Sequence, residues 1–264
     1  FLINYATTMS MLEITQFYFS VIVPQAVWIL IDSFIAVGLC IAVTQAQTAR
    51  TLAPSRPTAR LIGSHTLASI WGQTAINYAF LFGLIGLLFA QSWFRCHEFD
   101  SRDIDTSLWW ILGDNYESEL ISIVCLFQFV NAAAVYNFGY RFRRSWITNY
   151  SLVVLYSAFI AVISSLVLAN PNRFGCMFRI NCGNPDVLVD LGYSRPSWHI
   201  TPYNSPIGHN VLPHHFRWTL WALCITNIIL CLAYEKLVVL GPVGRWAKRR
   251  WIRRKGDRKL KLKL

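Results

Sequence analysis

The chain has 264 residues, of which 55% are hydrophobic and only 14% are charged. This composition leaves too few polar side chains to cover a soluble globule of this size, which excludes a soluble fold. The net charge of +11 would suit nucleic acid, but the basic residues gather beside apolar stretches, so we expect a lipid bilayer and no nucleic acid as partner.

Six long apolar stretches predict an all-α membrane protein with six transmembrane helices. The expected spans are, in chain order, residues 2–23, 26–46, 66–94, 120–140, 149–169 and 216–240. Pro24 separates the first two spans, and this short turn predicts two antiparallel neighbouring helices. Basic residues gather near Arg50, near Arg143 and after Tyr234. Because such residues stay in the cytosol, the odd-numbered spans are predicted to run outward.

The same pattern predicts three parts. Residues 1–46 form a first transmembrane hairpin that carries the site, and residues 47–240 form four further transmembrane helices with luminal loops. Of these loops, the segment 96–119 is acidic, and the segment 170–215 contains six prolines and is expected to form a small cap. Residues 241–264 form a basic cytosolic tail, in which Trp246 and Trp251 alternate with arginines and lysines. This mixture favours contact with anionic lipid.

Two acidic residues lie inside the first two predicted spans, where a charge costs at least about 2.5 kcal/mol. Glu13 lies in the first span, and at about 100° per residue it falls within an arc of roughly 80° together with Tyr5, Gln16 and Ser20. Asp32 lies in the second span among apolar residues and needs a cation or a hydrogen-bond donor. We expect Asp32, Tyr5, Glu13 and Gln16 to bind a cation. The alternative is that Asp32 snorkels to the luminal interface and Glu13 only hydrogen-bonds another helix.

The predicted cap carries cysteines and histidines. Cys176 and Cys182 are close in sequence, and an oxidising lumen would allow a disulfide between them. The predicted cap also contains four histidines whose spacing fits no zinc motif, so no metal site is expected. A solvated loop is the simplest interpretation, and pH sensing is an alternative. The histidines are His199, His209, His214 and His215.

Two blocks of the sequence resemble the fifth class of P-type ATPases. Residues 28–32 (WILID) and 52–63 (LAPSRPTARLIG) are similar to the sixth transmembrane helix of that class and the cytosolic loop that follows it. Residues 127–129 (FQF) and 142–149 (FRRSWITN) resemble a helix and basic turn near the end of its polyamine-pump branch. The order and spacing of the two blocks agree with that family.

The resemblance implies that the chain, which opens on Phe1, is a C-terminal fragment with the fifth to tenth transmembrane helices of a pump. The whole protein would be a translocase that moves polyamines out of late endosomes, lysosomes or vacuoles. Asp32 matches the acidic position of the sixth helix and Tyr5 an aromatic position of the fifth, while Glu13 matches no acidic position of the family. The fragment contains no DKTGT phosphorylation motif, so it has no catalytic domain and no cofactor of its own, and ATP and Mg²⁺ are expected in the full-length protein.

Other functions stay open at this point. The sister branch of the same class extracts misinserted helices in the endoplasmic reticulum. A secondary transporter or channel would need only the six spans, although the first and last three show no internal repeat. A third possibility is a non-catalytic membrane subunit whose polar residues only hold helices together.

Overall fold

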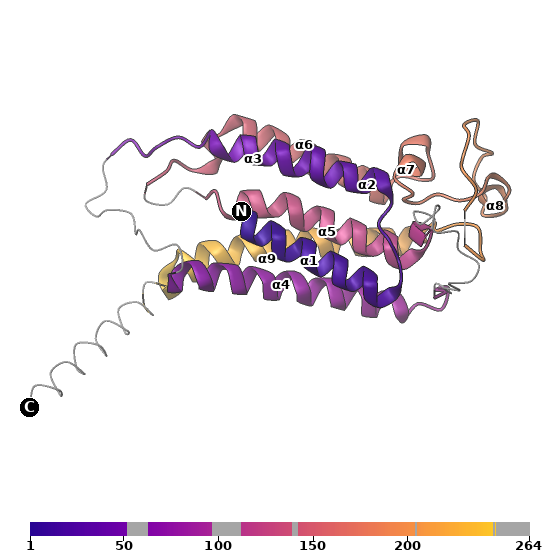
Figure 1. The fold of residues 1–264 in the computed structure, drawn as a ribbon, viewed down its shortest axis with the longest axis horizontal. Coiled ribbons are helices and arrows are strands. Elements are labelled where there is room, and N and C mark those ends of the chain that lie inside the picture. The colour runs from indigo at the N-terminus through magenta and orange to yellow at the C-terminus, as the bar shows by residue number, and fades with distance from the viewer. Residues whose placement is uncertain (52–62, 97–111, 139–141, 204, 245, 247–264) are drawn as a thin grey trace, which may run out of the picture.

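A computed structural model describes residues 1–51, 63–96, 112–138, 142–203, 205–244 and 246. These residues form a bundle of long helices that run roughly side by side, with two short helices at one end (Figure 1). The end that carries the short helices is called the cap end. The opposite end carries Arg50, Arg143 and Arg144 and is called the basic end. The segment 52–62, the segment 97–111 and most of the tail lie outside the described residues.

The first helix, α1 (Leu2–Phe19), is shorter than the predicted span. It ends where Ser20 adopts a left-handed backbone conformation with φ 54°. The chain then passes Pro24 and continues in the opposite direction as α2 (Gln25–Ile29), the π-helix η1 (Leu30–Ala36) and α3 (Val37–Thr44). Ser118 holds this connection, because its hydroxyl donates to the carbonyl of Ile22 at 2.6 Å.

The remaining long helices lie close to their predicted positions. They are α4 (Ser64–Phe89), α5 (Tyr116–Val135), α6 (Tyr150–Leu168) and α9 (His214–Ala233), and α9 continues as the π-helix η4 (Tyr234–Val239). Short connections at the basic end pack together: the backbone N–H of Arg144 donates to the Gln47 carbonyl at 3.0 Å, and its guanidinium donates to Gln47 Oε1 at 2.6 Å. The bundle therefore joins two of the basic segments at one end.

Five stretches of helix are long and apolar enough to cross a membrane: Gln25–Thr44, His65–Phe89, Tyr116–Val135, Tyr150–Leu168 and His214–Gly244. The described part of the chain is thus an all-helical, multi-pass membrane protein. Helix α1 is not among the five, because seven of its eighteen residues are polar (Asn4, Thr7, Thr8, Ser10, Glu13, Thr15 and Gln16). A sixth span at this position stays a prediction.

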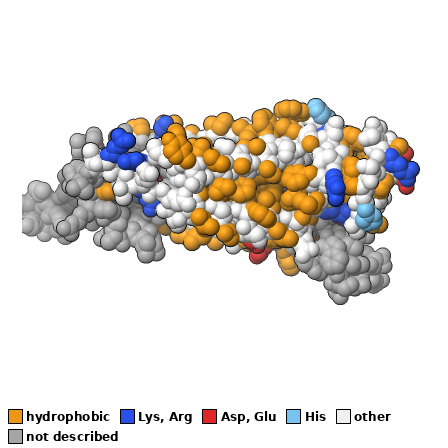
Figure 2. All heavy atoms as spheres, turned by 90° about the horizontal axis from the view of Figure 1, so that it is seen from above, with side chains coloured by type: hydrophobic (Ala, Val, Ile, Leu, Met, Phe, Trp, Pro, Cys, Tyr) orange, Lys and Arg blue, Asp and Glu red, His pale blue; other side chains and the backbone are white. Residues whose placement is uncertain are grey.

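Helix α5 is the centre of the bundle. Every one of its residues is buried, and α1, α4, α6 and α9 all pack against it. The stretch Tyr150–Leu168 is more hydropathic than α5, yet only 22% of it is buried. This inversion is expected in a bilayer, because lipid requires an apolar outer face while the interior tolerates paired polar groups. Figure 2 shows apolar side chains along the middle of the visible face and basic ones toward its ends.

The cap end consists of α7 (Arg173–Met177), α8 (Pro185–Asp190) and the loops around them. These segments share a small core of their own, made of Cys182, Leu188, Ile200, Tyr203 and Val211. A disulfide joins Cys176 to Cys182, with their Cα atoms 5.0 Å apart. The cap is therefore an ordered unit placed on one end of the bundle.

Candidate functional site

The structure brings together two of the predicted site residues, Tyr5 and Asp32. The Tyr5 hydroxyl donates a hydrogen bond of 2.7 Å to Asp32 Oδ1, across the two segments that Pro24 separates. Both segments pack against α5, so this helix holds the two side chains at their spacing. The only hydrogen bond described for the Asp32 carboxylate comes from a neutral phenol, and no ion pair among the described residues includes Asp32.

Asp32 lies in the π-helical turn η1, which is wider than an α-helical turn and occurs frequently at functional sites. The turn leaves Asp32, Ser33 and Phe34 exposed, while Leu30, Ile31 and Ile35 are buried against the bundle. The carboxylate is therefore reachable from outside the described helices. A ligand cation at this position would meet one carboxylate and one hydroxyl oxygen.

Two aromatic rings lie beside Tyr5, one member of the hydrogen-bonded pair. The ring centroid of Tyr5 lies 4.8 Å from that of Phe129 and 6.3 Å from that of Phe1. Phe129 belongs to the FQF sequence that carries the second block of family resemblance, and the structure places it against Tyr5, which is hydrogen-bonded to Asp32 of the first block. Aromatic faces beside a carboxylate suit an organic cation, which can use charge and cation–π attraction together.

The structure separates the other two predicted residues from this pair. Glu13 is exposed, whereas Gln16 is 7% exposed and its Nε2 atom is buried without a described partner. The reason is helical geometry: Met11 and Thr15 face the core, and each is two residues from Glu13, about 160° around the axis. The polar residues predicted to share one arc of α1 are thus partly buried in the bundle and partly exposed.

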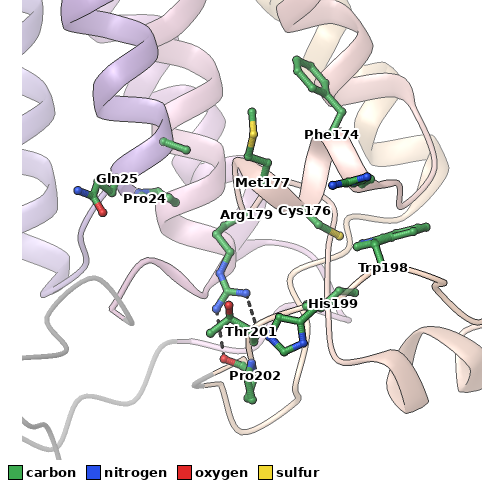
Figure 3. A pocket seen from close by; sticks show the side chains of 13 residues that line it. Pro24, Gln25, Phe174, Cys176, Met177, Arg179, Trp198, His199, Thr201 and Pro202 are labelled. Carbon is green, nitrogen blue, oxygen red and sulfur yellow. Dashed lines mark hydrogen bonds between the residues drawn. The ribbon is translucent and has the colours of Figure 1, made fainter.

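A cavity lies elsewhere, at the cap end. Its volume is about 1080 Å³, and it opens between the start of α2 and the cap, near Arg173, Arg179, Trp198 and His199 (Figure 3). The guanidinium of Arg179 donates to the backbone carbonyls of Thr201 and Pro202 at 2.8 and 3.2 Å. A cavity with two arginines and no acidic residue in its wall is poorly suited to a cation, and Asp32 does not line it.

An ion pair attaches the cap to the bundle. Arg179 donates to both carboxylate oxygens of Asp114, at 2.8 and 2.6 Å, and lies 4.1 Å above the ring of Tyr203. Burial raises the pKa of Tyr203 well above its usual value, and the charge of Arg179 acts in the opposite direction. Burial also lowers the pKa of His209. Among the described residues, no three histidine, cysteine or acidic side chains converge as a metal site would require.

Sequence reasoning missed a second polar cluster between α4 and η4. Ser69, Gln73 and Asn77 recur every four residues on α4, and Asn227, Cys231 and Glu235 recur every four residues on α9 and η4. Since residues four apart share a helix face, the two stripes were visible in the sequence. Only the packing of the antiparallel helices shows that they face each other.

No protein-family model and no curated protein matches this chain.

Proposed function

We propose that this chain is the C-terminal membrane part of an ATP-driven cation transporter, of the polyamine-transporting branch of the fifth class of P-type ATPases. The two blocks of resemblance support the class, and the multi-pass helical bundle agrees with it. The observation that carries the proposal is the Tyr5–Asp32 pair. Its exposed carboxylate lies in a π-helical turn of an apolar stretch, and its one hydrogen bond among the described residues comes from a phenol. An acidic residue within a membrane-spanning stretch is by default a candidate for an ion or substrate site.

In this proposal, Asp32 and Tyr5 bind the ammonium group of a polyamine. The ammonium donates to the Asp32 carboxylate, whose Oδ2 atom has no hydrogen bond in the described contacts. The Tyr5 ring, which rests on Phe129, presents an aromatic face to the same charge. ATP and Mg²⁺ would act in the parts of the full-length protein that carry the phosphorylated aspartate, and phosphorylation would drive the changes that open the site to each side in turn.

The first test uses spermine and the chain in lipid nanodiscs. A ligand that binds only the folded state stabilises it, by about 2.7 kcal/mol when its concentration is a hundred times Kd. Spermine should therefore raise the thermal midpoint of the wild-type chain. It should have little effect on Asp32→Asn, which keeps the volume of the side chain and removes its charge, and an intermediate effect on Tyr5→Phe.

Glu13→Gln is the matched control, because it removes an exposed carboxylate from the neighbouring helix. It should leave the spermine response intact. Equal responses in wild type and Asp32→Asn would contradict the assignment of the site. In the full-length protein, Asp32→Asn should reduce spermine-stimulated dephosphorylation while autophosphorylation persists, and this second measurement tests the class of transporter independently of the isolated chain.

A further inference from the structure

Glu235 is a buried acidic residue that takes no part in the Tyr5–Asp32 pair. It lies in η4 with 5% of its surface exposed, and the wider π-helical turn directs it toward α4. The hydroxyl of Ser69 donates to its Oε2 atom at 2.6 Å. Gln73 Nε2 approaches the same oxygen at 3.5 Å and donates to the Cys231 carbonyl at 2.9 Å. Two side chains of α4 therefore hold one oxygen of this carboxyl.

The surroundings of Glu235 supply no paired cation. The two ion pairs among the described residues are Arg179–Asp114 and Arg195–Asp186, both at the cap end. The ionisable groups whose charges interact with Glu235 are His65 of α4, Tyr136 at the end of α5 and Tyr234, the residue before it. Lys236 is the next residue in the chain, but its side chain is exposed. An ionised Glu235 would thus be a buried charge without a salt-bridge partner, which is costly.

The described contacts of Glu235 involve one oxygen of its carboxyl group. Both are donors to Oε2, and none involves Oε1. A carboxylate and a neutral carboxylic acid can both accept in this way. Burial without an ion-pair partner among the described residues favours the neutral acid, in which Oε2 accepts and Oε1 carries the proton.

A track of polar groups leads from Glu235 toward the middle of the bundle. Asn227 Nδ2 and Cys231 Sγ both approach Asn77 Oδ1 at 3.3 Å, and Gln128 Nε2 donates to the Asn77 carbonyl at 3.0 Å. Gln128 directly precedes Phe129, which contacts Tyr5. The central helix α5 therefore connects this track to the neighbourhood of the first site.

We propose that Glu235 is a proton-binding site, separate from the Tyr5–Asp32 pair, in which Ser69 and Gln73 hold the carboxyl group and the proton enters from the basic end of the bundle. The small exposed fraction of Glu235 and its position near the start of α4 place the opening at that end. The proposal stands on these contacts and does not depend on which cation the protein transports.

Infrared spectroscopy of the chain in lipid nanodiscs tests it, because a protonated carboxyl group has its own C=O stretching band. Wild type should show such a band at neutral pH, and Glu235→Gln should lose the equivalent of one carboxyl group per chain. Ser69→Ala should shift the frequency of the band without removing it, because the 2.6 Å hydrogen bond is lost. Glu13→Gln, which removes an exposed carboxylate, should leave the band unchanged.

Two results would overturn the proposal. One is a spectrum of a folded Glu235→Gln variant that still contains the whole band, since Glu235 would then be ionised and its contacts purely structural. The other is loss of the band in Asp32→Asn, which would assign the proton to the first site. If Glu235→Gln fails to fold, the frequency shift in Ser69→Ala decides the question. Spermine binding is read separately, so a failure of either proposal is distinguishable from a failure of the other.

Discussion

Arg217 is the most unusual single residue of the bundle, because it is among the largest fully buried side chains and is only 1% exposed. Its guanidinium donates to the carbonyls of Ala169 and Leu168, at 2.6 and 3.3 Å, and to Asn170 Oδ1 at 3.1 Å. The two carbonyls are acceptors at the end of α6 that no N–H of that helix reaches. Arg217 thus ties the start of α9 to the end of α6.

We expect Arg217→Met to destabilise the protein strongly. Each buried acceptor left without a donor costs roughly 1–3 kcal/mol, and methionine fills much of the volume without replacing any of the three hydrogen bonds. Thermal unfolding in detergent should show a much lower midpoint. Arg173→Met, at an exposed position of α7, serves as the control and should change the midpoint little. Equal changes of the midpoint in the two variants would show that the buried hydrogen bonds of Arg217 do not add to the stability of the fold.

At the scale of elements, the cap contains a group that should make it sensitive to acid. Nδ1 of His209 accepts a hydrogen bond of 3.1 Å from the backbone N–H of Val211, and the imidazole faces the ring of Tyr116 at 6.0 Å. A protonated imidazole cannot accept at Nδ1, and burial already lowers the pKa of His209. The folded cap therefore favours neutral His209.

The sign of the pH effect follows from this preference. The unfolded chain titrates near pH 6.5, so as the pH falls below that value it binds a proton that the folded cap resists. Stability should be full above pH 6.5 and fall with acid, by at most about 1.4 kcal/mol per pH unit. Thermal midpoints between pH 8 and pH 5 would measure this slope.

His209→Asn keeps an acceptor that does not titrate and should flatten the pH dependence. His199→Asn changes an exposed histidine of the same cap and should leave the slope as it is. A slope that survives His209→Asn would assign the acid sensitivity to another group.

For the basic tail, the prediction of lipid binding rests on the sequence alone. Its described part ends at Trp246, and residues 247–264 lie outside the described residues. Each Lys or Arg near an anionic surface contributes about 1 kcal/mol, within a Debye length of about 8 Å at physiological salt. A peptide of residues 244–264 should therefore bind phosphatidylserine vesicles strongly at low salt, weakly at high salt and hardly at all to neutral vesicles. Binding that ignores lipid charge would remove the electrostatic interpretation.

At the scale of the whole molecule, polar groups lie inside and apolar groups face outward. The central helix α5 contains Glu119, Gln128 and Asn131, all buried. Helix α6 and the stretch Gln25–Thr44 are more hydropathic, yet only 22% and 33% of them are buried. In water this order would be unstable. In lipid it is favourable, because the outer surface meets hydrocarbon and each interior polar group can pair with another helix.

The same arrangement explains the ends of the molecule. Two basic segments are joined by the contacts between Arg144 and Gln47, and the cap closes the opposite end through the ion pair between Arg179 and Asp114. Basic and proline-rich segments, which alternate along the chain, therefore lie at opposite ends of the bundle. This separation agrees with the predicted topology, in which the basic end faces the cytosol and the cap faces the lumen.

The sequence by itself determined the helical, membrane-spanning class and the approximate positions of five spans, because length and hydropathy are local properties of a segment. It also indicated the pairing of Cys176 with Cys182 through their short separation. It did not determine whether α1 spans the membrane, because the polar residues of α1 make its hydropathy lower than that of the five spans. It also grouped Glu13 with Tyr5, although the two side chains face different surroundings.

Tertiary packing decided which residues meet at the two candidate sites, because periodicity shows which residues share a helix face but not what that face contacts. Asp32 faces Tyr5 since both segments pack on α5, and Glu13 points away because the buried face of α1 is centred on its other side. Glu235 meets Ser69 and Gln73 only because α4 and η4 run antiparallel in this register. Such contacts join residues 27 to 166 positions apart in the chain, and no local pattern specifies them.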